Sequence, residues 1–379
     1  MTPPNQDVRV DCWRWRHALW SLPALLLIAM QVRPVLGRCD RTVLGTLVGG
    51  DALLQSGILG WTVRHFWHPL TCVKLPIFFP AESALMSMDS LLGQALLVAP
   101  VAALADPTPA LLYNLAVVLT LLLTAASAAA LWLASSSGQP AGRRAAGAGL
   151  CALLLLGAPF TTWQLGMLNQ ISPPWVVLLL AVLWRGWRRL VAGGDPRPWW
   201  WAAAACLVLQ AAWGWYGFAD AVFVAGTCAA VALWRAVRTG RTAALLRSLV
   251  FPVVVSLPLV MALAWPYLAL RSETPEYTRD VGAVSFYSAQ VRFLGNPGPH
   301  RLAWADFTGD ALPAAERARL NTDAVLHPGW IIAACALVGV WRWRRFTTEQ
   351  RRFGLLVAGV GGVGVVMAFG ESGGLPPGS

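Results

Sequence analysis

The chain has few charged residues for its length. Asp, Glu, Lys and Arg make up 12% of its 379 residues, Lys74 is the single lysine, and 57% of the residues are hydrophobic. The mean hydropathy is +0.57. A chain with so few polar side chains cannot cover the surface of a water-soluble globule. The composition therefore excludes a soluble protein and predicts an all-α polytopic membrane protein.

The sequence also lacks the motifs of nucleotide-dependent enzymes. Residues 359–364 (GVGGVG) have the glycine spacing of a dinucleotide-binding loop, but they lie inside an apolar segment without the strand and helix that such a loop needs. We interpret these glycines as a surface for close helix packing. The sequence contains no P-loop, no Cys-His metal framework and no cytosolic nucleotide-sugar domain. A soluble activated nucleotide donor therefore has no evident place to bind.

The positive charge of the chain comes almost entirely from arginine. The formal net charge is +11, but the arginines form short clusters at the ends of apolar runs, as the orientation of membrane helices requires. We therefore expect no binding to nucleic acid. Arg9, Arg14 and Arg16 precede the first apolar run, which predicts an inner N-terminus. Later clusters that need the same inner side are 143/144, 185/188/189, 235/238/241/247 and 342/344/345/351/352.

About nine crossings satisfy these clusters. Besides the first run at 18–30, we predict spans near 110–134, 145–160, 173–190, 199–216, 218–234, 249–268, 328–341 and 353–369. If the apolar run 91–105 crossed the bilayer, every later arginine cluster would lie on the outer side of the membrane. We therefore interpret this run as a re-entrant or interfacial helix. Residues 1–379 then form a single transmembrane domain with two large extracytoplasmic loops, 38–109 and 271–327. If the first run is instead a cleaved signal peptide, Asp51 stays on the same outer side.

Asp51 is an acid at the boundary between membrane and water, and we predict that a surface helix begins near it. A carboxylate at this boundary is placed to remove a proton from an acceptor while a lipid-borne donor lies beside it. The simpler interpretation is that Asp51 caps the helix that follows. Asp89, just before the run 91–105, is the second catalytic candidate. It would bind the acceptor, bind a metal or cap a helix.

Outer cations and aromatic rings are the candidates for substrate binding. Positive charge stabilises a departing anionic group, and aromatic rings offer a surface on which a substrate can stack. Each candidate has a plainer role, because outer cations contact lipid headgroups and Trp is enriched at membrane interfaces. A divalent cation is an open cofactor question, since His65 and His68 could bind one together with Asp51 or Asp89. The substrate-binding candidates are His65, Arg64, Lys74 and Trp61 in the first loop and Arg271 and Arg279 in the second.

Several short motifs resemble those of one family of membrane enzymes. These are 50–54 (GDALL), 58–61 (ILGW), 77–81 (IFFPA), 87–93 (SMDSLLG) and 113–115 (YNL). They are similar to bacterial glycosyltransferases of the GT-C superfamily, near the glycosyltransferase 39 and YfhO-like proteins. The resemblance implies a multi-span bundle, a first outer loop with juxtamembrane helices and an acidic catalytic residue, and a polyprenyl-phosphate-linked sugar donor.

The sequence thus predicts a glycosyltransferase of the bacterial cell membrane, which moves a sugar from a polyprenyl-phosphate donor to an extracytoplasmic lipid, glycan or protein, with Asp51 as general base. A transporter or flippase of lipid-linked glycans is the alternative. Transporters carry polar or broken helices near the bilayer midplane, whereas the acids here concentrate in the outer loops, with Asp220 as the exception. The chain stops without further spans that the resemblance implies, so a C-terminally truncated fragment or a noncatalytic assembly subunit stays open.

Overall fold

The computed structural model describes residues 18–45, 51–68, 91–158, 161, 164–171, 173–273, 330–346, 348, 351–352, 354–355 and 357–359. Every regular element among these residues is a helix. This confirms the all-α prediction for the described part of the chain. Most of the predicted span 353–369 and of the second loop, 271–327, lies outside the described residues.

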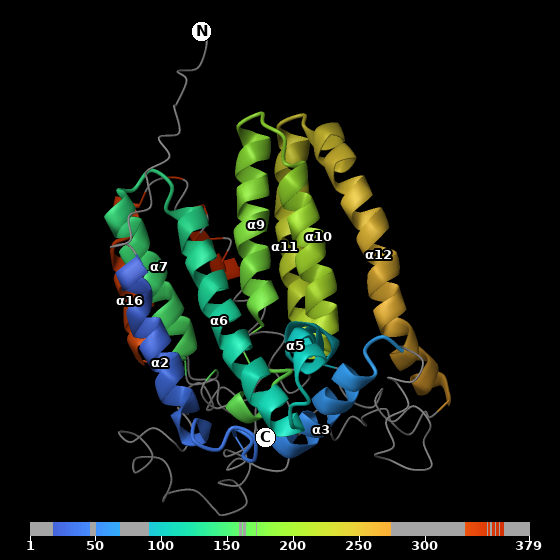
Figure 1. Ribbon diagram of the computed structural model, residues 1–379. Coiled ribbons are helices and arrows are strands. Elements are labelled where there is room, and N and C mark those ends of the chain that lie inside the picture. Colours follow the sequence, from blue (N-terminus) through green and yellow to red (C-terminus); the bar gives the residue numbers. More distant parts are fainter. Residues whose placement is uncertain are drawn as a thin grey trace, which may run out of the picture.

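Long helices stand side by side and form the body of the molecule (Figure 1). Each of them covers an apolar run that the sequence predicts as a span, although α7 is shifted toward the N-terminus and α12 is longer than its run. The bounds are Leu22–Val32 for α2, Pro109–Ser135 for α6, Ala141–Leu156 for α7, Pro174–Val191 for α9, Arg197–Trp213 for α10, Trp215–Arg238 for α11, Thr242–Glu273 for α12 and Trp330–Trp341 for α16.

Local sequence explains where these helices begin and end. Thr108 caps α6, because its hydroxyl accepts a hydrogen bond of 3.2 Å from the Leu111 backbone N–H, and Pro109 follows at the first helical position. Gly214 separates α10 from α11. Gly240 turns the chain between α11 and α12 with φ of +67°, a backbone angle that favours glycine.

Three described helices are long and apolar enough to cross a bilayer: Pro109–Ser135, Trp215–Arg238 and Thr242–Ala269. A helix of this kind is about 36–42 Å long, whereas the hydrocarbon core of a bilayer is about 30 Å thick. The apolar segments Leu19–Val35 and Leu92–Leu104 are shorter. The three long helices indicate a multi-pass membrane protein.

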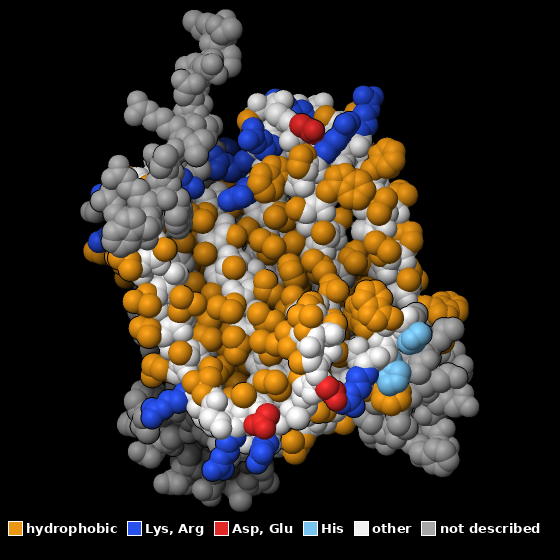
Figure 2. Space-filling view, viewed as in Figure 1, with side chains coloured by type: hydrophobic (Ala, Val, Ile, Leu, Met, Phe, Trp, Pro, Cys, Tyr) orange, Lys and Arg blue, Asp and Glu red, His pale blue; other side chains and the backbone are white. Residues whose placement is uncertain are grey.

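The surface of the bundle has an apolar belt with charge at its two ends (Figure 2). On α12 large apolar side chains such as Phe251 and Trp265 point outward and are exposed, as lipid-facing side chains are. The connections α6–α7, α9–α10 and α11–α12 all lie at one end of the bundle (Figure 1). We call this the basic end, because arginines gather there (Figure 2).

Two further helices lie at the opposite end, which we call the α3–α5 end (Figure 1). They are α3, Asp51–Arg64, and α5, Leu92–Leu104. Both pack against α6, and α5 also contacts α10. Both helices belong to one continuous apolar core, which is formed by buried side chains of α2, α3, α5, α6 and α7. The helix predicted to begin near Asp51 is therefore present, and so is a helix over the run 91–105.

Candidate functional site

Asp51 is the first residue of α3 and its side chain is exposed at the α3–α5 end. Its carboxylate interacts electrostatically with the phenol of Tyr113, a buried residue in the first turns of α6. The Tyr113 hydroxyl donates a hydrogen bond of 3.3 Å to the carbonyl of Leu165. The acid therefore stands at the rim of the bundle, above the start of α6. A carboxylate that reaches solvent there can accept a proton from a bound substrate.

Three of the predicted substrate-binding residues lie at the far end of α3. Trp61 and His65 stack on each other with ring centroids 3.9 Å apart, and the His65 ring Nδ1 lies 3.0 Å from the Trp61 carbonyl oxygen. Arg64 forms an exposed ion pair with Asp106 at 3.9 Å. Arg64 is 13 residues from Asp51, which is about 20 Å along a helix. The structure therefore does not bring these three residues to Asp51.

The remaining predicted site residues fall outside what the structure describes. Asp89, Lys74 and Arg279 lie in undescribed segments. Arg271 belongs to the last turn of α12, but its side chain is not described. The roles predicted for these four residues stay predictions. Among the described residues no group of three or more His, Cys, Asp or Glu side chains could hold a metal ion.

A loop that carries two arginines packs on the start of α6. The loop 38–45 is fixed to the start of α6 by the buried side chain of Asn114, the residue next to Tyr113 in the sequence. The Asn114 Oδ1 accepts a hydrogen bond from the Leu44 N–H at 2.9 Å, and its Nδ2 donates to the carbonyls of Cys39 at 3.0 Å and Thr42 at 2.7 Å. This loop and α3 therefore both pack against α6.

Arg38 and Arg41 are exposed on this loop. Arg41 pairs with the neighbouring Asp40 at 3.3 Å. Gly45, with φ of +86°, ends the described loop where a Cβ atom would clash with the backbone of Gly166. The sequence motifs do not identify these arginines as site residues, because the loop becomes part of the site only through the contacts of Asn114.

Two amide side chains hold α3 and α5 in place, the half-buried Gln55 and the buried Gln94. The Gln55 amide of α3 donates a hydrogen bond to the Asn169 Oδ1 at 2.9 Å and accepts one from the Leu168 N–H at 2.6 Å. The Gln94 amide of α5 donates to the Trp213 carbonyl at 2.9 Å and more weakly to that of Leu168 at 3.4 Å. Residues 168–169 therefore link both helices, and Asp51 begins a helix that polar contacts fix in position.

Several buried polar atoms near the end of α10 have no hydrogen-bond partner in the described part of the chain. They are the Gln94 Oε1, both amide atoms of Gln210, and the indole N–H groups of Trp175 and Trp213. The rings of Trp175 and Trp213 meet edge to face at 5.8 Å. Unpaired buried polar atoms are costly and cluster at functional or hydrated places. The sequence signal for them is a glutamine inside an apolar run, as at Gln94 and Gln210.

Comparisons with protein-family models, with curated proteins and with solved structures found no match for this chain.

Proposed function

We propose that this protein is a membrane glycosyltransferase that moves a sugar from a polyprenyl-phosphate-linked donor to an extracytoplasmic acceptor. Asp51 is the general base in this proposal. The observation that carries it is the position of Asp51: an exposed carboxylate at the start of a short helix, which the half-buried Gln55 amide holds at the end of an apolar bundle. That end is opposite to the arginine-rich connections, which membrane proteins keep on the inner side (Figure 2).

The chemistry needs three functions at this end of the bundle. Asp51 removes the proton of an acceptor hydroxyl as the oxygen attacks the anomeric carbon of the sugar. The bond from that carbon to the phosphate oxygen breaks, and the polyprenyl phosphate leaves with the bonding electrons and its negative charge. A cation stabilises this charge. Arg38 supplies positive charge on the loop beside α6. Arg41 on the same loop is paired with Asp40, and Arg64 is paired with Asp106 at the other end of α3.

The proposal includes a membrane topology with about nine crossings and with α5 as a helix that does not cross. Its support is that α5 is short and contains Pro100, and that α3 and α5 pack together on α6 at one end. The helix ends beside the connections α6–α7, α9–α10 and α11–α12, at the other end of the bundle, carry arginine clusters. The arginine clusters therefore gather at one end of the bundle, as the positive-inside bias requires for the inner face.

Single cysteines in a variant without native cysteines test this topology. Arg188→Cys and Arg238→Cys at the basic end should react with a membrane-impermeant thiol reagent only after the cells are opened. Arg38→Cys and Arg64→Cys at the α3–α5 end should react in intact spheroplasts. Topology reporters fused after residues 45 and 107 should both show that the fusion point lies on the outer side of the membrane. Labelling of position 188 or 238 in intact spheroplasts, or opposite readings at 45 and 107, would overturn the arrangement.

The activity is tested with the purified full chain in liposomes. We would supply polyprenyl-phosphate donors that carry radiolabelled sugars, with delipidated cell-envelope material as the acceptor source. We expect label to leave the lipid fraction and to appear on the acceptor only when the protein is present. Label that stays on the lipid and moves across the bilayer would show a flippase. If the label stayed on every donor tested and did not cross the bilayer, an enzymatic role would be contradicted.

A further inference from the structure

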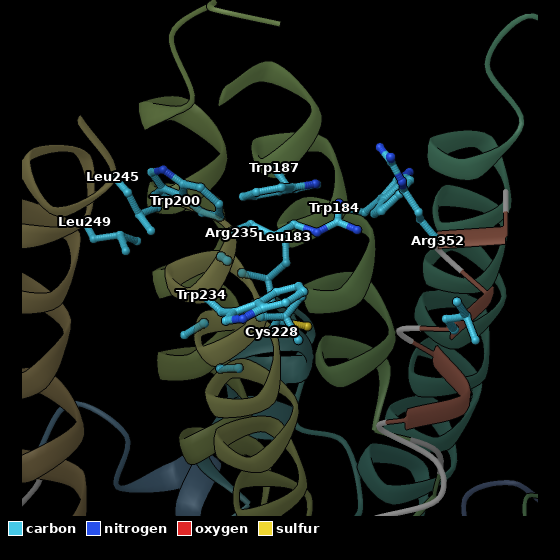
Figure 3. Close-up of a pocket in the computed structure, with 15 residues that line it drawn as sticks. Leu183, Trp184, Trp187, Trp200, Cys228, Trp234, Arg235, Leu245, Leu249 and Arg352 are labelled. Carbon is cyan, nitrogen blue, oxygen red and sulfur yellow. The ribbon is translucent and has the colours of Figure 1, made fainter. Parts of the chain in front are cut away.

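An apolar cavity lies near the basic end, far from the α3–α5 end (Figure 3). Its volume is about 250 Å³. Its walls come from α9, α10, α11, α12 and the segment around residues 352–355, and they are rich in tryptophan: Trp184, Trp187, Trp200 and Trp234. Leu245 and Leu249 close one side, and Arg352 approaches from the opposite side (Figure 3).

Two cations belong to the lining of this cavity, Arg235 and Arg352. The Arg235 guanidinium lies over the ring of Trp187, 5.8 Å from its centroid. Neither arginine forms an ion pair with a described residue; the ion pairs of the described part involve Arg41 and Arg64. Within the described part of the chain, no acidic side chain pairs with the two positive charges of the cavity.

Charge and apolar surface are arranged along the length of the cavity. Arg235 is in the last turn of α11, at the basic end, whereas Cys228 lies two turns deeper, about 10 Å along the helix. Val231 and Trp234, which also line the cavity, are exposed on the outside of the bundle. The cavity is thus lined partly by side chains that face the surroundings of the helices, which in a membrane are lipid chains.

We propose that this cavity binds an anionic phospholipid. The phosphate lies between Arg235 and Arg352, and an acyl chain extends along the apolar walls toward Cys228. The volume is below the ~300–1,000 Å³ of pockets that enclose whole drug-sized ligands, so the cavity encloses part of a longer molecule. Basic pockets between helices at the inner face of a membrane hold lipid headgroups by the same combination of charge and apolar contact.

The test measures phospholipid binding to the purified full chain by native mass spectrometry, with phosphatidylglycerol, phosphatidylcholine and inorganic phosphate as separate probes. We expect phosphatidylglycerol to bind more tightly than phosphatidylcholine. Arg235→Gln and Arg352→Gln should each weaken phosphatidylglycerol binding about fivefold, and the double variant about 25-fold, at ~1 kcal/mol per charge. Arg235→Lys keeps the charge and should bind nearly as the wild type.

Two further variants distinguish specific binding in the cavity from general attraction of anionic lipid to the arginine-rich surface. Arg197→Gln removes an exposed arginine at the same end that does not line the cavity, and it should leave phosphatidylglycerol binding unchanged. Ala232→Phe fills the apolar wall and keeps both charges, so it should weaken phosphatidylglycerol binding but not binding of inorganic phosphate. Equal losses in Arg197→Gln and Arg235→Gln, no loss in the double variant, or no effect of Ala232→Phe would overturn the proposal. Unchanged thermal unfolding in phosphatidylcholine nanodiscs confirms that each variant is folded.

Discussion

Asp51→Asn should lower the rate of sugar transfer by about 10²- to 10⁴-fold, the usual loss when a general base is removed. The amide keeps the size of the side chain and its capacity for hydrogen bonds, but it has no lone pair basic enough to take the acceptor proton. We expect expression and donor binding to be close to those of the wild type. The measurement is the initial rate of transfer from a labelled polyprenyl-phosphate donor in liposomes.

The same substitution separates catalysis from helix capping. Asn and Ser cap helices about as well as Asp, so a capping residue would tolerate Asp51→Asn and Asp51→Ser. If Asp51 is the general base, both variants should lose sugar transfer. Asp106→Asn is the matched control, because Asp106 is an exposed acid at the same end whose partner is Arg64; it should retain transfer. Asp89→Asn should be milder than Asp51→Asn if Asp89 positions the acceptor. Full transfer by Asp51→Asn would end the assignment of Asp51 as base.

Asn114→Ala should destabilise the protein by about 2–4 kcal/mol. The substitution removes three hydrogen bonds and leaves the Leu44 N–H and the Cys39 and Thr42 carbonyls without their partner in a buried place. Because these contacts fix the loop that carries Arg38 and Arg41, we also expect weaker donor binding. The measurements are thermal unfolding in nanodiscs and the concentration of donor that half-saturates transfer.

Two replacements at the same position test whether hydrogen bonding or volume is responsible. Asn114→Leu has the same branched shape and the same number of side-chain heavy atoms but no hydrogen-bonding groups, so it should be destabilised like Asn114→Ala. Asn114→Asp keeps an acceptor for Leu44 but turns a carboxylate oxygen toward two carbonyl oxygens, so it should be destabilised as well. Wild-type stability of Asn114→Leu would contradict the role that we give to these bonds.

The helices could be predicted from the sequence because apolar length and arginine position are local signals. The predicted runs 110–134, 173–190 and 199–216 coincide within three residues with Pro109–Ser135, Pro174–Val191 and Arg197–Trp213. The helix at Asp51 was predicted from the acid that begins it, a preference that the helix dipole explains.

The contacts around the site could not be predicted in this way, because they join residues far apart in the sequence. The Gln94 amide meets a backbone carbonyl 119 residues away, and the Gln55 amide meets Asn169 at a separation of 114 residues. Every residue has a backbone carbonyl, so the sequence does not show which of them a side chain will contact. Trp61, Arg64 and His65 were grouped with Asp51 because they are near in sequence, but a straight helix separates its two ends.

The most direct test of the account is an experimental structure of the full chain with a polyprenyl phosphate bound. The account predicts that the phosphate lies at the α3–α5 end, beside Asp51 and within reach of the loop that carries Arg38 and Arg41. A polyprenyl phosphate bound only at the basic end, with none beside Asp51, would contradict it.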